Sequence, residues 1–353
     1  MRPFVKGLIG VVTLALVIVV LFSGFIFNPG SPSIKPKEVQ AAEITPDSTI
    51  ASTVSSVVSV TSAPSPATTV SFYSPAADSS VETARPLRQH TVPTAPATVP
   101  AIQHYTLDSF PVSVYTPQDV PQEQTLQLLV VLHGMNGNGQ AFSQGILSFA
   151  REHHLMVMAP TFNYNPDYRS PEIVAREDAK LTVALDQMVD ELGPATHRTL
   201  KTQVLLYGFS RGCQLALHYA MIFPARVSGA VLFSGGAYTL PYATYGKTDK
   251  PLPFPVGVYD LKKYTGRAFD HENFVKIPFQ IEVGMSDTDP NGVSRAWDSY
   301  LGNTRLQRAQ NFYHILKEMG LNVTLETFPD TGHEVSRAMN QSAAEFLQKL
   351  LEV

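Results

Sequence analysis

The sequence predicts an α/β fold, with a mainly parallel central sheet and helices on both faces, for residues 104–353. Three observations predict it. Short apolar runs rich in strand-forming residues alternate with segments of helical spacing. The run at 127–132 is continuously apolar, which is typical of a strand buried on both faces. Ser210 lies between glycines where a predicted strand meets a predicted helix.

The elements up to Ser210 follow these patterns in chain order. Pro171 is expected in the first turn of a long helix, which Gly193 and Pro194 are expected to end. The predicted elements are a strand or hairpin at 105–115, a strand at 127–132, a helix at 141–152, a strand at 156–159, a helix at 171–192 and a strand at 202–207.

The alternation continues after Ser210. Pro278 is expected to keep the first residue of its strand out of the hydrogen-bonded ladder, because proline has no N–H. The predicted elements are a helix at 213–220, strands at 229–233 and 277–283, a helix at 305–319, a strand at 323–328 and a helix at 336–351.

An aromatic-rich insertion at about 235–276 follows the strand predicted at 229–233, which comes after the helix at 213–220. It is too long for a simple connection between two elements. Beside the active face it would form a wall or lid of the substrate pocket. The alternative is an excursion that packs on the domain without touching substrate.

Residues 1–27 predict a short cytoplasmic end and a transmembrane signal-anchor. The stretch from Gly7 to Phe27 carries no charge and, at about 1.5 Å per residue, is long enough to cross a bilayer about 30 Å thick. Arg2 and Lys6 precede it, which places the remainder outside the cytoplasm. The alternative is a secreted protein, released by signal cleavage near Ala41.

Residues 28–103 predict a disordered linker between this anchor and the domain. They are mostly Pro, Ser, Thr, Ala and Val, and their only aromatic residues before Pro100 are Phe72 and Tyr73. Such a segment buries too little apolar surface to offset its chain entropy, and its prolines extend it.

The segment Gly208-Phe209-Ser210-Arg211-Gly212 has the G-x-S-x-G pattern of a nucleophile elbow. In such an elbow a sharp turn exposes the serine hydroxyl, and the glycines allow strand and helix to approach closely. The sequence therefore predicts that Ser210 is a catalytic nucleophile.

His333 is the predicted base that would accept the proton of Ser210. Of the ten histidines, three follow the serine, as the order Ser, acid, His requires. His314 falls inside a predicted helix and His271 inside the insertion. His333 lies in the loop between the last strand and the last helix, from which a base can reach the elbow.

Asp287 is the predicted acid, and Asp289 is the alternative. Both follow the strand that ends at residue 283, and Asp287 is nearer to the strand end. With Asn291 and Asp298, these residues also partly match a calcium-binding loop. Pro290 inside the loop and the absence of a leading helix disfavour that interpretation, so no metal is expected.

The backbone N–H groups of Met135 and Arg211 are the predicted oxyanion donors. Arg211 immediately follows the nucleophile, and Met135 lies in the glycine-rich loop 133–139 after an early strand. A plain glycine-rich turn is the alternative for this loop. It lacks the lysine and the spacing of a phosphate-binding loop, so no nucleotide cofactor is expected.

Overall composition excludes two further classes. The net charge of −4 offers no basic face for nucleic acid. The single cysteine, Cys213, excludes an intrachain disulfide.

The order Ser210, Asp287, His333, together with His133-Gly134 after an early strand, resembles the α/β-hydrolase superfamily of serine hydrolases. The resemblance covers residues 104–353. The elbow and the segment 284–290 are similar to bacterial esterases near the polyhydroxybutyrate-depolymerase and feruloyl-esterase branch. This resemblance implies hydrolysis of a small or polymeric carboxylic ester without a cofactor.

These observations predict a membrane-anchored, extracytoplasmic serine hydrolase, with ester hydrolysis as the expected reaction. Two other classes stay open. A peptidase or acyltransferase of the same fold would use the same triad. A non-catalytic binding module displayed on the linker would keep the fold without reacting.

Overall fold

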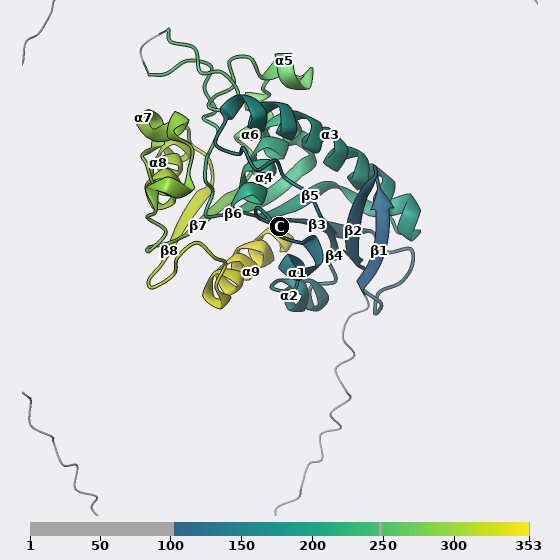
Figure 1. Ribbon diagram of the computed structural model, residues 1–353. Helices are drawn as coiled ribbons and strands as arrows, with labels where there is room; N and C mark the ends of the chain where they lie inside the picture. The colour runs from purple at the N-terminus through teal and green to yellow at the C-terminus, as the bar shows by residue number, and fades with distance from the viewer. Residues whose placement is uncertain (1–101, 247–248, 353) are drawn as a thin grey trace, which may run out of the picture. The chain divides into compact units, whose positions relative to one another are not determined.

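An eight-stranded sheet forms the centre of the computed structural model, which describes residues 102–246 and 249–352 (Figure 1). The transmembrane segment and nearly all of the linker predicted for residues 1–103 lie outside the described residues. Within the described residues, no helix combines the length and apolarity that a membrane span requires. The strands, in their order across the sheet, are β1 (Ile102–Leu107), β2 (Phe110–Tyr115), β4 (Met156–Pro160), β3 (Leu126–Leu132), β5 (Leu200–Phe209), β6 (Val227–Phe233), β7 (Phe279–Gly284) and β8 (Val323–Phe328).

The sheet is parallel from β4 to β8, and only the β1–β2 hairpin and its pairing with β4 are antiparallel. The central strands pair in register, with Val131 opposite Tyr207 and Tyr207 opposite Val231. Every residue of β3 is buried, as its apolar run predicts. Because parallel strands end at the same edge, the loops after β3, β5, β7 and β8 meet there.

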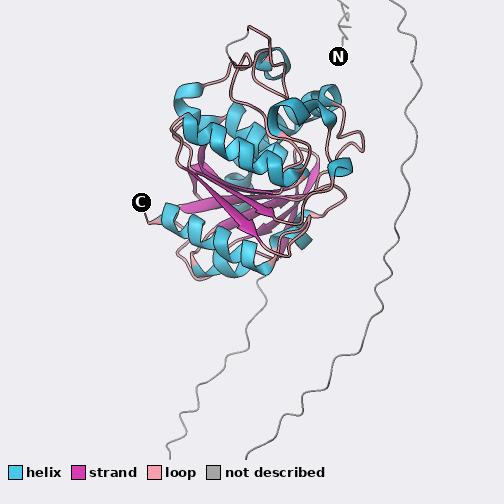
Figure 2. Cartoon of the chain, turned by 90° about the vertical axis from the view of Figure 1, so that its left-hand side faces the viewer, coloured by secondary structure: helices cyan, strands magenta, loops and turns pink. Residues whose placement is uncertain are grey.

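Helices cover both faces of the sheet (Figure 2). One face packs against α3 and α4 and, towards β7 and β8, against α8. The other packs against α1, α2 and α9. This layered, mainly parallel arrangement confirms the predicted α/β-hydrolase fold. The helices are α1 (Gly139–Ser143), α2 (Leu147–Glu152), α3 (Pro171–Thr196), α4 (Arg211–Ile222), α5 (Leu261–Thr265), α6 (His271–Phe274), α7 (Asp298–Leu301), α8 (Arg305–Glu318) and α9 (Arg337–Leu351).

The single helix predicted at 141–152 is two short helices, α1 and α2. The break falls at the turn around Gly145. A Cβ on Gly145 would lie 2.8 Å from Oδ1 of Asn340, so this turn packs directly against α9. A contact with a residue so distant in sequence has no local signal.

The long helix α3 does not stop at Gly193-Pro194, as its sequence predicts, but ends at Thr196. Its end is closed by His197 in the left-handed conformation, with φ 53°. The amide of Arg198 donates to the carbonyl of Gly193 over 3.0 Å, and that of His197 donates to Pro194 over 3.3 Å. This pair of bonds is a Schellman motif, which satisfies the last carbonyls one turn later than predicted.

The 235–276 insertion packs mainly on the domain. Its aromatic residues Tyr238, Phe254 and Phe274 are buried in the core on the α4 side of the sheet. Among the described residues of the insertion, only Gly236 lines the cavity beside Ser210. The prediction that its aromatic residues wall the substrate pocket is therefore wrong: Tyr238, Phe254 and Phe274 pack in the core, and Tyr245 and Tyr259 are exposed.

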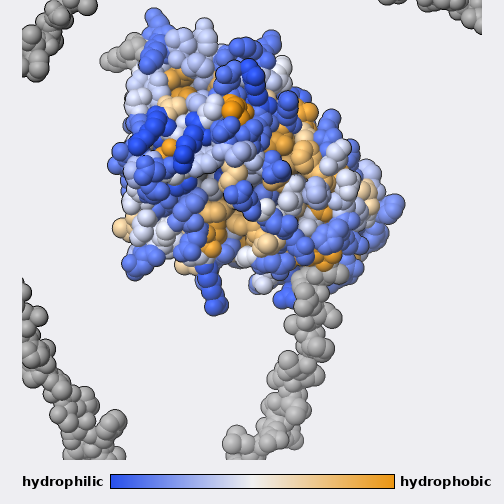
Figure 3. All heavy atoms as spheres, viewed as in Figure 1, coloured by the Kyte–Doolittle hydropathy of each residue, from blue (hydrophilic) through white to orange (hydrophobic). Residues whose placement is uncertain are grey.

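Polar residues predominate on the face of the molecule shown in Figure 3, and apolar residues are scattered over it. Among the described residues, the exposed large apolar side chains are Val183, Tyr245, Tyr259 and Met285. Small-molecule recognition is therefore to be sought in a cavity and not on a broad apolar surface.

Candidate active site

Ser210 occupies a sharp turn between β5 and α4. Its φ of 54° is unusual for a residue with a side chain. A Cβ on Gly208 would lie 2.5 Å from the carbonyl oxygen of Gly212, and one on Gly212 would lie 2.1 Å from that of Leu132. No side chain fits at either position, so these glycines are what allow the turn to form.

Ser210, His333 and Asp287 form one hydrogen-bonded chain. Oγ of Ser210 lies 2.9 Å from Nε2 of His333, and Nδ1 of His333 lies 2.8 Å from Oδ2 of Asp287. Asp287 is buried, whereas a third of the His333 side chain is exposed. The structure thus brings together the three side chains that the sequence predicts, each from a different loop.

The loops after β7 and β8 hold Asp287 and His333 against each other. The amide of Ser286 donates to the carbonyl of Thr331 over 2.9 Å. A Cβ on Gly284 would lie 2.2 Å from that same carbonyl oxygen, so the two loops meet backbone to backbone. This contact brings His333 to Ser210, although the two residues are 123 positions apart in the sequence.

The alternative acid Asp289 and the two histidines that the sequence disfavours as bases lie away from Ser210. Asp289 accepts a hydrogen bond from the amide of Asn291 and caps a short 3-10 turn. His271 begins α6, and His314 is exposed on α8. The residues that line the cavity beside Ser210 include none of them.

The two predicted oxyanion donors border the same cavity as Ser210. Met135 and Arg211 both line it. The amide of Arg211 is at the first position of α4, where a helical N–H has no acceptor within the helix. A Cβ on Gly134 would lie 3.3 Å from Cβ of Ser210, so a glycine lets the Met135 loop approach the serine.

His133 fixes the start of this loop. Nδ1 of His133 lies 2.6 Å from the carbonyl of Gly134, and its Nε2 accepts from the amide of Phe162 over 3.0 Å. Burial lowers the pKa of His133, which keeps the ring neutral. A neutral ring is what this pattern needs, because Nδ1 donates while Nε2 accepts.

The Arg211 side chain turns away from Ser210 into a buried ion cluster. Both oxygens of Asp178 accept from its guanidinium, and Glu177 accepts a third hydrogen bond over 2.7 Å. Burial raises the pKa of Asp178, but the charge of Arg211 and the hydrogen bond of His218 outweigh burial and hold it below its ordinary value. The cluster therefore anchors the first residue of α4.

His218 joins this cluster to the insertion. Its Nδ1 lies 2.6 Å from Oδ2 of Asp178, and its Nε2 lies 2.7 Å from Oγ1 of Thr239. The Thr239 hydroxyl donates to the carbonyl of Pro255 over 2.6 Å, so it can only accept from the histidine. Nε2 of His218 therefore donates to Thr239, while Nδ1 faces the carboxylate of Asp178.

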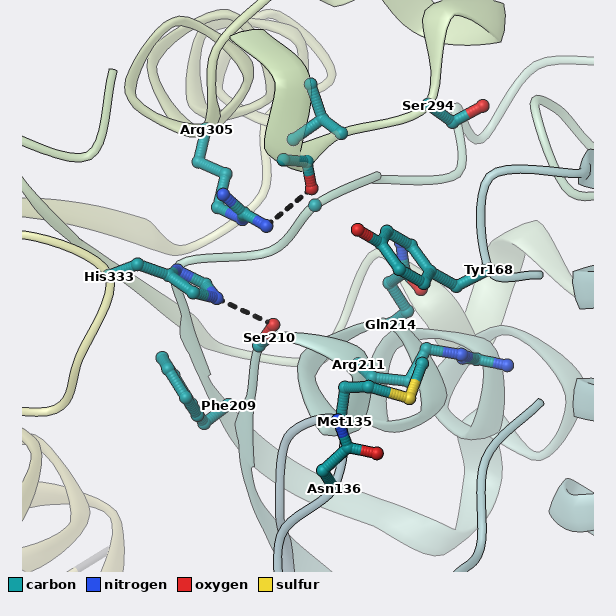
Figure 4. Close-up of a pocket in the computed structure, with 13 residues that line it drawn as sticks. Met135, Asn136, Tyr168, Phe209, Ser210, Arg211, Gln214, Ser294, Arg305 and His333 are labelled. Atoms are coloured by element: carbon teal, nitrogen blue, oxygen red, sulfur yellow. Dashed lines mark hydrogen bonds between the residues drawn. The ribbon is translucent and has the colours of Figure 1, made fainter. Parts of the chain in front are cut away.

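A cavity of about 340 Å³ opens beside Ser210. Figure 4 shows the Met135 loop, Tyr168 and Arg305 arranged around the serine. Its lining mixes apolar and polar groups, which suits a small organic substrate. The lining residues are Met135, Asn136, Tyr168, Phe209, Ser210, Arg211, Gln214, Gly236, Gly292, Val293, Ser294, Arg305 and His333.

Arg308 holds two of the loops that line this cavity through hydrogen bonds to their backbone. It is fully buried. Its guanidinium donates to the carbonyls of Gly236 over 2.5 Å, Ser294 over 2.6 Å and Gly302 over 2.8 Å. One side chain thus fixes three loops, two of which line the cavity.

Sequence reasoning missed Gln214, Arg305 and the Asp178–His218 pair. Gln214 had a signal, since it lies one helical turn after Ser210 and residues four apart share a helix face. Arg305 had no such sequence signal, because its hydrogen-bond partners Asp287 and Gly292 are 18 and 13 residues away in the sequence. Among residues 102–246 and 249–352, no group of three His, Cys, Asp or Glu side chains is placed to hold a metal ion.

Comparison with known proteins adds a family and a fold. The model of the family described as "Putative esterase" matches residues 104–353. Poly(aspartic acid) hydrolase-1 from Sphingomonas sp. KT-1 has a similar structure, with 22% identity, coverage of 70% of this chain and 99% of that one, and a TM-score of 0.52. LpqC, the poly(3-hydroxybutyrate) depolymerase from Bordetella parapertussis, is also 22% identical, with coverage of 70% and 90% and a TM-score of 0.54. At this identity the two likenesses establish the fold. No curated protein sequence matches this chain.

Proposed function

This chain belongs to the esterase family and is a serine hydrolase of the carboxylesterase type, and from that premise we propose that Ser210, His333 and Asp287 are its catalytic triad. The observation that carries the proposal is the hydrogen-bonded chain from the Ser210 hydroxyl through His333 to the buried Asp287, with distances of 2.9 and 2.8 Å.

In the proposed reaction, Ser210 attacks the ester carbonyl while Nε2 of His333 accepts its proton. Asp287 holds Nδ1–H and stabilises the imidazolium that forms. The amides of Met135 and Arg211 donate to the oxyanion of the tetrahedral intermediate. His333 then protonates the leaving alcohol, and a water molecule, activated by the same histidine, releases the acid and restores Ser210.

Ser210→Ala tests this proposal. We expect turnover of a p-nitrophenyl ester to fall by about 10⁴-fold or more, because the remaining groups only stabilise the transition state. Thermal unfolding should show a folded variant. Ser299→Ala, an exposed position on α7, is the matched control and should react like the wild type. A Ser210→Ala variant with substantial residual hydrolysis excludes Ser210 as the nucleophile.

Three further assays distinguish ester hydrolysis from the other functions that this fold could have. Labelling of Ser210 by a fluorophosphonate distinguishes a reactive serine from a binding module. Peptide anilides test for a peptidase, and added alcohols test for acyl transfer. The likeness to a poly(3-hydroxybutyrate) depolymerase and a poly(aspartic acid) hydrolase supports including polymeric substrates.

We also propose that residues 7–27 anchor the enzyme in a membrane, with residues 104–353 outside the cytoplasm. The uncharged run after Arg2 and Lys6 supports this. The full chain should stay with membranes during alkaline carbonate extraction, and a chain without residues 1–27 should not. Release of the full chain, with a new amino terminus near Ala41, would instead indicate signal cleavage.

A further inference from the structure

Gln214 is a buried polar side chain whose hydrogen-bonding capacity is unused. It lies one helical turn after Ser210 and lines the cavity beside it. Only 6% of Gln214 is exposed, and its amide oxygen has no hydrogen-bond partner in the described part of the chain. Buried polar groups are nearly always paired, so an unpaired one that faces a cavity points to a ligand.

Arg305 is a second such group on the same cavity. It is 8% exposed. Its guanidinium donates to the carbonyl of Gly292 over 2.6 Å and more loosely to Asp287 over 3.4 Å, while Nε has no partner among the described residues. Arg305 therefore carries a positive charge and an unused N–H donor.

Gly236 leaves room between these two side chains. A Cβ on Gly236 would lie 3.7 Å from Nε2 of Gln214, 3.8 Å from Nε of Arg305 and 3.9 Å from Cγ1 of Val293. These are ordinary contact distances, so the space admits a small group without strain. We call this space, bounded by Gln214, Arg305, Gly236 and Val293, the donor recess.

The Gln214 wall of the donor recess lies on the side of the serine that suits the acyl chain, while Arg305 lies above Ser210 and His333 in Figure 4. His333 must face the leaving alcohol, because it donates the proton to that oxygen. In Figure 4, His333 and Gln214 lie on opposite sides of Ser210. An acyl chain that leaves the carbonyl away from His333 therefore runs towards Gln214.

We propose that the donor recess binds an acceptor oxygen on the acyl chain, so that the enzyme prefers esters of acids that carry a second carbonyl or carboxylate group. This inference rests on the proposed function and specifies its substrate class. The polar atoms that lie nearest to a Cβ on Gly236 are Nε2 of Gln214 and Nε of Arg305. Both are N–H donors and one belongs to a cation, so together they favour an oxygen acceptor. A plain alkyl chain would leave both donors unpaired in the complex and would bind less well.

Three methyl esters of similar length test the preference, with released methanol as the common readout. Methyl hexanoate carries no second oxygen function, dimethyl glutarate carries a neutral carbonyl, and monomethyl glutarate carries a carboxylate. We expect kcat/KM for one or both glutarates, after correction for the two equivalent groups of the dimethyl ester, to exceed that for methyl hexanoate by about tenfold. The better glutarate identifies the acceptor as charged or neutral.

Two variants assign the preference to the donor recess. Gln214→Leu removes one donor, and Gly236→Ala fills the space while leaving both donors in place. Each should reduce the glutarate-to-hexanoate ratio to about one. Gln341→Leu, at an exposed position on α9, is the matched control and should keep the wild-type ratio.

A wild-type ratio near one overturns the inference, and so does a ratio that survives both substitutions. If methyl hexanoate is hydrolysed in a Ser210-dependent manner in either case, the proposed function stands without it. If none of the three esters reacts, the inference falls, and fluorophosphonate labelling of Ser210 decides whether the proposed function falls with it. Gln214→Leu removes a donor, whereas Gly236→Ala fills the recess. If one variant misfolds, the substrate ratio of the other still tests the inference.

Discussion

Two clusters of buried polar side chains border the first turns of α4, and they differ in how completely they are paired. On one side, both oxygens of Asp178 and both ring nitrogens of His218 have partners, and Arg211 makes three hydrogen bonds. Its Nε is the exception. On the other side, Gln214 and Arg305 present unpaired atoms beside the cavity.

The difference separates support from recognition. A cluster whose charges compensate each other inside the protein has little left to offer a ligand, and its loss is felt as instability. A group left unpaired in the free protein contributes little to the fold and gains its partner only on binding. Substitutions in the two clusters should therefore move different measurements.

Asp178→Asn should have the largest effect. It removes the negative charge that both Arg211 and His218 contact, and it leaves the buried guanidinium with Glu177 as its remaining anion. We expect the free energy of unfolding to fall by about 3–5 kcal/mol, measured by urea denaturation. Asp190→Asn, at an exposed surface ion pair, is the control and should cost less than about 1 kcal/mol. Equal losses in the two variants would contradict the comparison.

Glu282→Gln should have the next largest effect, and only at alkaline pH. This carboxyl on the α9 face of the sheet has one oxygen paired with Gln280 and the other unpaired. Burial raises its pKa from an ordinary 4.5 to about 8. The unfolded chain therefore loses this proton near pH 4.5 while the folded chain keeps it up to about pH 8, so wild-type stability falls as pH rises through that window.

Gln carries no such proton. The variant should match the wild type at low pH and exceed its free energy of unfolding by roughly 2–4 kcal/mol at pH 9. Urea denaturation at a series of pH values measures the difference. Glu123→Gln, at an exposed position before β3, should show no such trend. A constant offset between Glu282→Gln and the wild type would show that Glu282 does not titrate in this range.

Thr239→Val should cost less, about 1–2 kcal/mol. The change keeps the shape of the side chain but removes the acceptor of His218 Nε2–H and the donor to the Pro255 carbonyl. The charges of the cluster remain. Thermal and urea unfolding measure the loss, with Thr202→Val at an exposed strand position as the control. A neutral outcome would mean that His218 finds another acceptor.

Gln214→Leu should change stability least, by no more than about 0.5 kcal/mol, because no hydrogen bond is lost. The same variant is the one expected to change substrate preference. A large loss of stability would place Gln214 with the supporting cluster and remove the contrast between the two sides.

The sequence predicts the fold best where burial is uniform. β3 is recognisable because both of its faces are covered, which makes its sequence continuously apolar. Ser210 is recognisable because its turn admits only glycine at positions 208 and 212. Chain order then selects His333 and Asp287, which the structure brings within hydrogen-bonding distance of each other.

The rest depends on contacts between distant residues. The break between α1 and α2 follows from Gly145 against Asn340, and the Arg211–Asp178 pair joins residues 33 positions apart. Aromatic composition does not tell whether an insertion faces a pocket or a core, as Tyr238 shows. Such arrangements need the packed tertiary structure.

The three carbonyls held by Arg308 have a practical consequence for redesign. The loops that carry Gly236, Ser294 and Gly302 share one buried anchor, so none of them is an independent module. Replacing one loop with that of a relative could remove one of the carbonyl groups that accept hydrogen bonds from the Arg308 guanidinium and leave a buried N–H group unpaired. A graft should therefore exchange all three loops together with Arg308, or leave all of them alone.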